Sequence, residues 1–112
     1  MKPKSHPPRY RVWVQPRVHA IRTRLPGDIR QRIRRAIDDL AQEARPPTSK
    51  GLTLPEGLDN KISTEWEARR IKLDDWRIVY VVSETWHEIA VMSVRQRPPY
   101  DYDDLADLLA EL

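Results

Sequence analysis

The chain has 112 residues, which suits a single domain, and 39% of them are hydrophobic, which allows a modest core. It contains no cysteine, so disulfides and thiolate metal sites are excluded, and a reducing cytoplasm is the expected location. Residues 1–50 hold 13 Lys and Arg against 4 Asp and Glu, whereas residues 51–112 hold 7 Lys and Arg against 13 Asp and Glu. The basic first half either binds the phosphate backbone of a nucleic acid or is an ordinary solvated surface.

The N-terminal part is predicted to contain an arm, a strand and a short helix. Residues 1–9 contain three prolines and no apolar periodicity, which predicts a disordered basic arm and no secretory signal. A single domain is expected over residues 10–112. Residues 10–15 alternate apolar and polar side chains, which predicts a strand that ends at Pro16. Residues 17–25 can form a short helix before Pro26 and Gly27 break the chain.

The clearest periodicity predicts a second helix. It would begin at Asp28, which occupies an N-cap position, and run through Ala44 to the break at Pro46 and Pro47. With the preceding helix it forms a helical hairpin whose apolar stripe faces the core. Its arginines lie off that stripe and are either ordinary surface or a basic patch: Arg30, Arg32, Arg34 and Arg35.

The second half is predicted to be mainly strands. Residues 48–61 are expected to form a loop, and residues 65–73, 76–82 and 88–94 to form an antiparallel meander with short turns. Asp103 or Asp104 can cap a final helix with leucines on one face. The order predicts an α+β fold: an antiparallel sheet of about four strands, an N-terminal helical hairpin on one face and a short C-terminal helix. The expected core includes Ile29, Ile33, Ile37, Leu40, Ile71, Leu73 and Ile78.

The basic residues of the meander are the best candidates for chemistry. The sequence has no metal-ligand spacing, Gly-rich loop or nucleophile elbow, so no metal and no cofactor is expected. Arg70 and Lys72 are two residues apart and share the open face of a strand whose other face carries Ile71 and Leu73. The turn after that strand can bring Arg77 close to Lys72.

Two further cations and two tyrosines follow the third strand of the meander. Arg95 and Arg97 share a face at its end, and Tyr100 and Tyr102 come just after it. Arginine forks bind phosphate oxygens and aromatic rings stack on unpaired bases, so the set suits a phosphodiester. Clustered positive charge also makes a lysine easier to deprotonate, as a general base requires.

Structural alternatives exist for each of these residues. Arg70 and Lys72 can lie on a solvated sheet face, and Arg77 can form an ion pair with Asp74 or Asp75. Core packing is the favoured interpretation of Trp76 and Tyr80.

Three segments together resemble the RelE superfamily of toxin–antitoxin systems. The first runs from Leu25 through the long helix to its terminating prolines, and the second is the hairpin of Arg70-Ile-Lys-Leu and Trp76-Arg-Ile-Val-Tyr. The third is Val91-Met-Ser-Val-Arg-Gln-Arg followed by the two tyrosines. The resemblance extends from about Tyr10 to Leu112, and the order of the three segments strengthens it.

The resemblance implies a metal-independent endoribonuclease that cleaves messenger RNA on the ribosome. The 2′-hydroxyl would attack the adjacent phosphorus and leave a 2′,3′-cyclic phosphate and a 5′-hydroxyl. The implied catalytic roles are a general base at Lys72, a general acid at Arg97, and stabilisation of the phosphorane by Arg70 and Arg77. Tyr102, or less favourably Tyr100, would stack on a base, and Arg95 would contribute to RNA binding.

The resemblance also implies partners and leaves two alternatives. The partners are a cognate antitoxin, the ribosome and mRNA, with a toxin–antitoxin hetero-oligomer as the expected assembly. The C-terminal apolar stripe is either an antitoxin contact or simple packing over the sheet. One alternative is a ParE-like toxin that acts on DNA gyrase without cutting RNA, which the cations of the open face disfavour. The other is an inactive relative that only binds RNA or an antitoxin.

No apolar run approaches the roughly 18–20 residues of a membrane span, so no membrane partner is expected.

Overall fold

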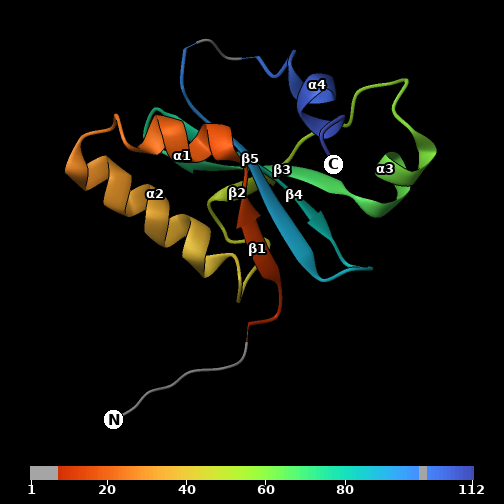
Figure 1. Ribbon diagram of the computed structural model, residues 1–112, viewed down its shortest axis with the longest axis horizontal. Helices are drawn as coiled ribbons and strands as arrows, with labels where there is room; N and C mark the ends of the chain where they lie inside the picture. Colours follow the sequence, from red (N-terminus) through yellow and green to blue (C-terminus); the bar gives the residue numbers. More distant parts are fainter. Residues whose placement is uncertain (1–7, 99–100) are drawn as a thin grey trace.

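The computed structural model describes residues 8–98 and 101–112, and a mixed sheet lies at its centre (Figure 1). Most of the predicted arm, residues 1–7, and the pair 99–100 lie outside the described residues. The elements in chain order are β1 (Arg11–Val14), α1 (Pro16–Arg22), α2 (Gly27–Asp39), β2 (Ser49–Gly51), α3 (Asn60–Glu65), β3 (Glu67–Leu73), β4 (Trp76–Ser83), β5 (Glu88–Gln96) and α4 (Leu105–Leu109).

The sheet has five strands in the order β1-β5-β4-β3-β2. The predicted meander is confirmed, because β3, β4 and β5 pair antiparallel in sequence order. Two features differ from the prediction of about four antiparallel strands. β1 pairs parallel to β5, and β2 forms within the stretch predicted to be a loop. The three residues of β2 have little intrinsic strand preference, so pairing with β3 defines this edge strand.

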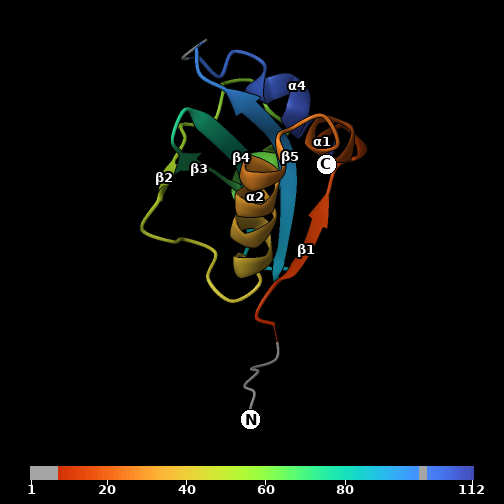
Figure 2. The ribbon, with the colours of Figure 1, turned by 90° about the vertical axis from the view of Figure 1, so that its left-hand side faces the viewer.

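The helical hairpin covers one face of the sheet, where α2 lies across it (Figure 2). Val18 of α1 and Ile33 of α2 are fully buried and belong to the same apolar cluster as Ile71 and Ile78 of the sheet. Every residue of the expected core is buried except Leu73, which is partly exposed at the end of β3. Apolar periodicity therefore predicted the orientation of α2 correctly.

The ends of α2 differ from the prediction. Pro26 is the residue that precedes the first turn, and Asp28 lies inside that turn, where a carboxylate still favours the positive end of the helix dipole. The helix ends at Asp39, although the apolar pattern continues to Ala44. Ala44 stays buried outside the helix, and its carbonyl accepts a hydrogen bond of 2.7 Å from the Tyr80 hydroxyl. The Ala44 carbonyl is thus satisfied by the Tyr80 side chain rather than by a hydrogen bond within a helix.

The opposite face of the sheet is covered at its centre by α4. The buried leucines of α4 (Leu105, Leu108, Leu109) pack with Val79, Val81, Ala90 and Met92 of the sheet. The expected position of the helical hairpin on one face is therefore confirmed for α1 and α2, and the C-terminal helix α4 lies on the other face. Among the described residues, no helix combines the length and the apolar character that a membrane crossing requires.

Candidate functional site

A row of cations crosses three strands on the face that α4 partly covers. Lys72, Arg77 and Arg95 are cross-strand partners in β3, β4 and β5. Directly opposed residues of paired strands point to the same side of a sheet, about 5 Å apart. The neighbouring residues Ile71 and Ile78 point into the core under α2. The row is therefore on the other face, as the sequence predicted for Lys72.

An irregularity in β5 gives Arg95 its place in this row. Val79 pairs with Ser93 and Tyr80 pairs with Val91, so Met92 is an extra residue in β5. Strict alternation from the buried Val91 would have turned Arg95 towards the core. The bulge resets the alternation, as bulges near functional sites commonly do. The sequence shows no mark of it, because the stretch from Ala90 to Val94 is apolar except for Ser93 and has no clear alternation.

Arg95 is held by the chain itself. Its two terminal nitrogens each lie 2.8 Å from an oxygen of the Asp104 carboxylate, and its Nε donates to the hydroxyl of Ser93. Only 18% of the Arg95 side chain is exposed. The hydrogen bonds from Arg95 lower the pKa of Asp104 despite the opposing effect of its burial. Asp104 was expected to be able to cap the last helix, but its side chain makes no capping hydrogen bond. An RNA phosphate at Arg95 would have to share or displace this carboxylate.

Tyr102 lies beneath two arginines. The guanidinium carbon of Arg97 is 4.6 Å from the centre of the Tyr102 ring, and that of Arg95 is 5.6 Å from it. Both contacts have cation–π geometry. The hydroxyl of Tyr102 is buried without a hydrogen-bond partner among the residues that the structure describes. The structure therefore brings Tyr102 to the cations, whereas Tyr100 lies outside the described residues.

The remaining predicted residues lie on the same face of β3 and β4. Lys72 is exposed, and the structure shows no ion pair for it within residues 8–98 and 101–112. Arg77 donates to the main-chain oxygens of Asp74 and Trp76 at 2.8 and 2.9 Å, so it does not form the alternative ion pair with Asp74. The Asp74 carboxylate instead accepts from Arg32 of α2 at 2.7 Å. Arg70 donates to the carbonyl of Thr48.

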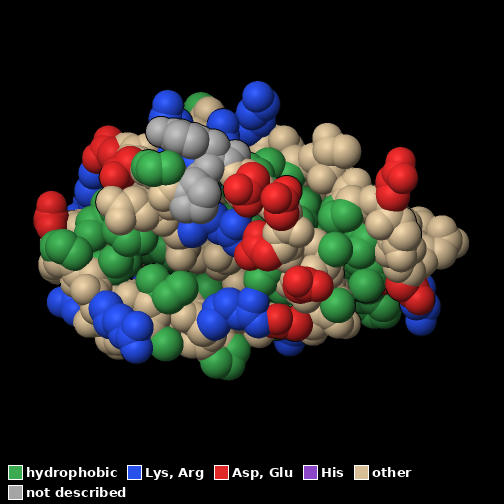
Figure 3. Space-filling view, turned by 90° about the horizontal axis from the view of Figure 1, so that it is seen from above, with side chains coloured by type: hydrophobic (Ala, Val, Ile, Leu, Met, Phe, Trp, Pro, Cys, Tyr) green, Lys and Arg blue, Asp and Glu red, His purple; other side chains and the backbone are tan. Residues whose placement is uncertain are grey.

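Sequence reasoning missed one cation of this face. Lys50 of β2 is the cross-strand partner of Arg70, so both side chains point to the side on which Lys72 lies. Lys50 was assigned to a loop because nothing in its neighbours indicates a strand. The C-terminal segment also carries exposed acidic residues (Asp101, Asp103, Asp104, Asp107), of which Asp104 contacts Arg95 of the site. Acidic side chains lie beside basic ones on the surface shown in Figure 3. The surface is thus mixed in charge, with the cations on the sheet.

We name the cation face as the set Lys50, Arg70, Lys72, Arg77, Arg95 and Arg97, with Tyr102 at its edge. Its donors can hold a polyanion from several sides, and its two lysines, Lys50 and Lys72, can exchange a proton. Within the described residues, no group of three or more His, Cys, Asp or Glu side chains is placed to hold a metal ion.

Comparisons with known proteins define the class to which this fold belongs. No protein-family model and no curated protein sequence matches the chain. Several solved structures do match, among them RelE proteins and complexes that contain RelE. A chain of the archaeal RelE–RelB complex from Pyrococcus horikoshii has 22% identity and a TM-score of 0.66, covering 80% of this chain and 96% of its own length.

Two bacterial structures give the same result. The isolated RelE toxin of E. coli has 16% identity and a TM-score of 0.59, covering 91% of this chain and 97% of its own. A chain of the RelBE2 toxin–antitoxin complex of Mycobacterium tuberculosis has 18% identity and a TM-score of 0.58. The match covers 80% of this chain and 99% of the Mycobacterium chain. This protein therefore has the RelE fold, and the resemblance found in the sequence is confirmed at that level.

Proposed function

We propose that this protein is the toxin of a toxin–antitoxin system and a ribosome-dependent endoribonuclease. The observation that carries the proposal is the row of Lys72, Arg77 and Arg95 on a RelE fold, with Arg97 and Tyr102 at its end. A ParE-like toxin that does not cut RNA has no need of such a row.

The proposed reaction is an internal transesterification of messenger RNA. The 2′-oxygen forms a bond to phosphorus while the bond from phosphorus to the 5′-oxygen breaks, which leaves a 2′,3′-cyclic phosphate and a 5′-hydroxyl. Lys72, entering as the neutral amine, takes the proton of the 2′-hydroxyl. Arginine is already protonated at neutral pH before the reaction, so no arginine of the cation face can accept the proton of the 2′-hydroxyl.

The arginines act on developing negative charge. Arg70 and Arg77, both half-buried, stabilise the pentavalent phosphorane, for which guanidinium donors are suited. Arg97 supplies a proton to the leaving 5′-oxygen, because an alkoxide is a stronger base than guanidine. Tyr102 stacks on an RNA base. The base either displaces Arg95 and Arg97 from the ring or stacks on the part of the ring that these arginines leave open.

The proposed partners are the ribosome, mRNA and an antitoxin in the cytoplasm. The ribosome supplies RNA held in one conformation, which this open sheet face alone does not provide. Support for the antitoxin comes from the Mycobacterium structure, which is a toxin–antitoxin complex, and from the Pyrococcus structure, which is a complex of RelE with RelB.

The test is cleavage of a defined mRNA on programmed ribosomes, with the 5′-hydroxyl ends mapped. The expected result is ribosome-dependent cleavage with cyclic phosphate ends, unchanged by a chelator. Lys61→Ala, in α3 away from the cation face, is the matched control and should cleave normally. Absence of cleavage by the unmodified protein would indicate a binding-only relative and refute the proposal.

A further inference from the structure

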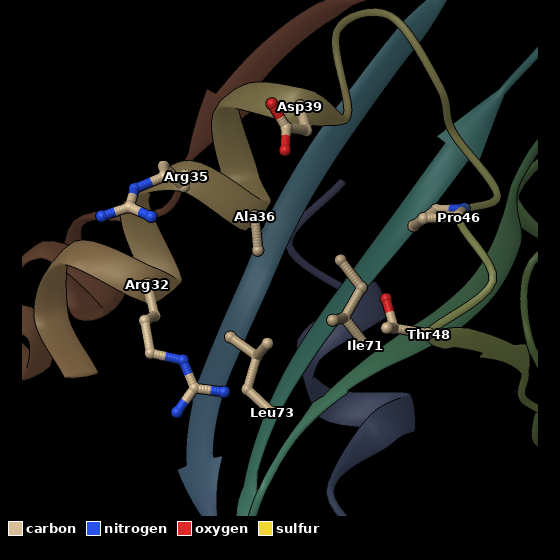
Figure 4. Close-up of a pocket in the computed structure, with 8 residues that line it drawn as sticks. All are labelled: Arg32, Arg35, Ala36, Asp39, Pro46, Thr48, Ile71 and Leu73. Atoms are coloured by element: carbon tan, nitrogen blue, oxygen red, sulfur yellow. The ribbon is translucent and has the colours of Figure 1, made fainter. Parts of the chain in front are cut away.

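Lys72 carries an exposed amine that the fold leaves without a partner. Ile71 and Leu73 point towards α2 (Figure 4), so Lys72, which lies between them in β3, points to the opposite side of the sheet. Its ammonium group forms no ion pair and no hydrogen bond within the part of the chain that the structure describes. This amine is therefore accessible to a reagent from solution.

Two arginines bring their guanidinium groups to the sides of Lys72. Arg77 is its cross-strand partner, about 5 Å away between β-carbons, and Arg70 precedes it by two residues on the same face, about 7 Å along the strand. Nη1 of Arg70 donates to the carbonyl of Thr48, which also accepts the main-chain N–H of Lys72. Nη1 of Arg77 donates to the carbonyl of Asp74, two residues after Lys72. Both guanidinium groups thus lie beside the lysine.

These two arginines keep donors that the protein does not use. Each makes its hydrogen bonds through Nη1, which leaves Nε and Nη2 without a partner among the described residues. Arg95 differs, because both of its terminal nitrogens are engaged with Asp104. The unused donors of Arg70 and Arg77 can hold the oxygens of one phosphoryl group next to the amine.

A phosphoryl group held at this place would carry an attached acyl group to Lys72. In an acyl phosphate, the mixed anhydride of a carboxylic acid and phosphoric acid, a single oxygen atom separates the carbonyl carbon from phosphorus. Arginines that bind the phosphoryl oxygens therefore place the carbonyl carbon near Nζ. Holding two reactants side by side accelerates their reaction without any change in the basicity of the amine.

We propose that Lys72 is a site of self-acylation by acyl phosphates. Its uncharged amine attacks the carbonyl carbon, a carbon–nitrogen bond forms, and the bond from the carbonyl carbon to the phosphate oxygen breaks. Inorganic phosphate leaves with that electron pair, and the nitrogen loses a proton to water. The resulting amide has lost the positive charge of the lysine. Only the consequence for activity rests on the proposed function: an acylated protein has no proton acceptor at this position.

The test compares two acylating reagents on the full-length protein. Acetyl phosphate carries the phosphoryl group, whereas the N-hydroxysuccinimide ester of acetic acid is uncharged and reports only the exposure and nucleophilicity of each lysine. Mass spectrometry would give the acetylation rate of Lys72 relative to that of Lys61, an exposed lysine of α3 away from the cation face. We expect this ratio to be about tenfold higher with acetyl phosphate than with the ester. Equal ratios for the two reagents would overturn the proposal.

Two further measurements test the role of the arginines. Excess inorganic phosphate should abolish the preference of acetyl phosphate for Lys72 and leave labelling by the ester unchanged, because it occupies the same donors. Arg70→Gln should lower the preference several-fold. Arg34→Gln is the matched control, because Arg34 is an exposed arginine of α2 in a loose pair with Asp38, and it should leave the preference unchanged. A preference that survives excess phosphate or Arg70→Gln would contradict recruitment by the arginines.

Lys50 provides an internal comparison. It is the cross-strand partner of Arg70, but β3 separates it from Arg77, so its preference for acetyl phosphate should be smaller than that of Lys72. An equal preference at Lys50 would show that the pair of arginines is not the cause. No measurement in this set involves ribosomes or RNA. Failure of selective acylation therefore leaves the nuclease proposal standing, and failure of cleavage leaves the acylation site standing.

Discussion

The buried hydroxyl of Tyr80 gives the sharpest prediction about stability. Tyr80 is fully buried, and its hydroxyl donates to the carbonyl of Ala44 at 2.7 Å. Burial raises the pKa of this hydroxyl, so it remains a protonated donor at neutral pH. Tyr80→Phe leaves the carbonyl in the interior without this partner, which costs about 1–3 kcal/mol. The bond connects β4 to the segment after α2, so its loss should loosen the point where the chain leaves the helix.

The magnitude can be converted into a melting temperature. For 112 residues the entropy of unfolding is about 0.24 kcal/mol per kelvin, so each kcal/mol corresponds to about 4 °C. Tyr80→Phe should therefore lower Tm by about 4–12 °C in thermal denaturation followed by circular dichroism. Tyr10→Phe is the matched control, because the Tyr10 hydroxyl donates to Glu84 at an exposed position where water can replace it. Its Tm should fall by less than about 2 °C. Equal shifts for the two variants would refute the argument from burial.

Two other substitutions test the stability of the fold: one should not destabilise it, and the other should destabilise it only above acidic pH. Tyr102→Phe should leave Tm unchanged or raise it, because the Tyr102 hydroxyl is buried without a partner among the described residues; a fall of several degrees would contradict this reasoning. Burial acts to raise the pKa of Glu67, but hydrogen bonds from Arg45 and Arg69 outweigh it and hold the pKa below its usual value. A lowered pKa stabilises the fold above the unfolded-state pKa, and that stability disappears as the pH falls through the folded-state pKa. Glu67→Gln should therefore cost about 1 kcal/mol or less at pH 7 in urea denaturation, since the Glu67 side chain is 40% exposed. This cost should shrink as the pH falls below the unfolded-state pKa of about 4.3 and disappear below the lowered folded-state pKa. A difference that persists unchanged in acid would show that the ion pairs are not its cause.

Strong periodicity explains which parts of the fold could be predicted. The stripe of α2 and the alternation of β3 each place one set of apolar residues on one side, so their orientation follows from the sequence. β2 and the bulge at Met92 depend on partners far away in the chain, and neither leaves a local pattern. The face chosen by α4 also depends on tertiary packing, because an amphipathic helix is compatible with either side of a sheet that has apolar residues on both.

The same distinction applies to the candidate site. The pairing of Lys72 with Arg77 follows from a two-residue turn, which the sequence indicated. Lys50 was missed because its strand was missed. The position of Arg95 agrees with the prediction for a reason that sequence could not supply, namely the bulge, and its bidentate pair with Asp104 was not foreseen. Local patterns thus identified the residues, whereas the long-range pairing decides which of them are available to a ligand.

The proton-accepting role of Lys72 is the central claim, and a comparison of three proteins tests it most directly. Single-turnover cleavage on programmed ribosomes would be measured against pH for the unmodified chain, Lys72→Ala and Lys72→Arg, with ribosome binding measured in parallel. A general base contributes about 10²- to 10⁴-fold in rate, so both variants should lose about that much while ribosome affinity falls far less. Lys72→Arg keeps the positive charge but cannot accept the proton. Near-normal cleavage by Lys72→Arg would contradict the account, because it would show that charge alone is required at this position.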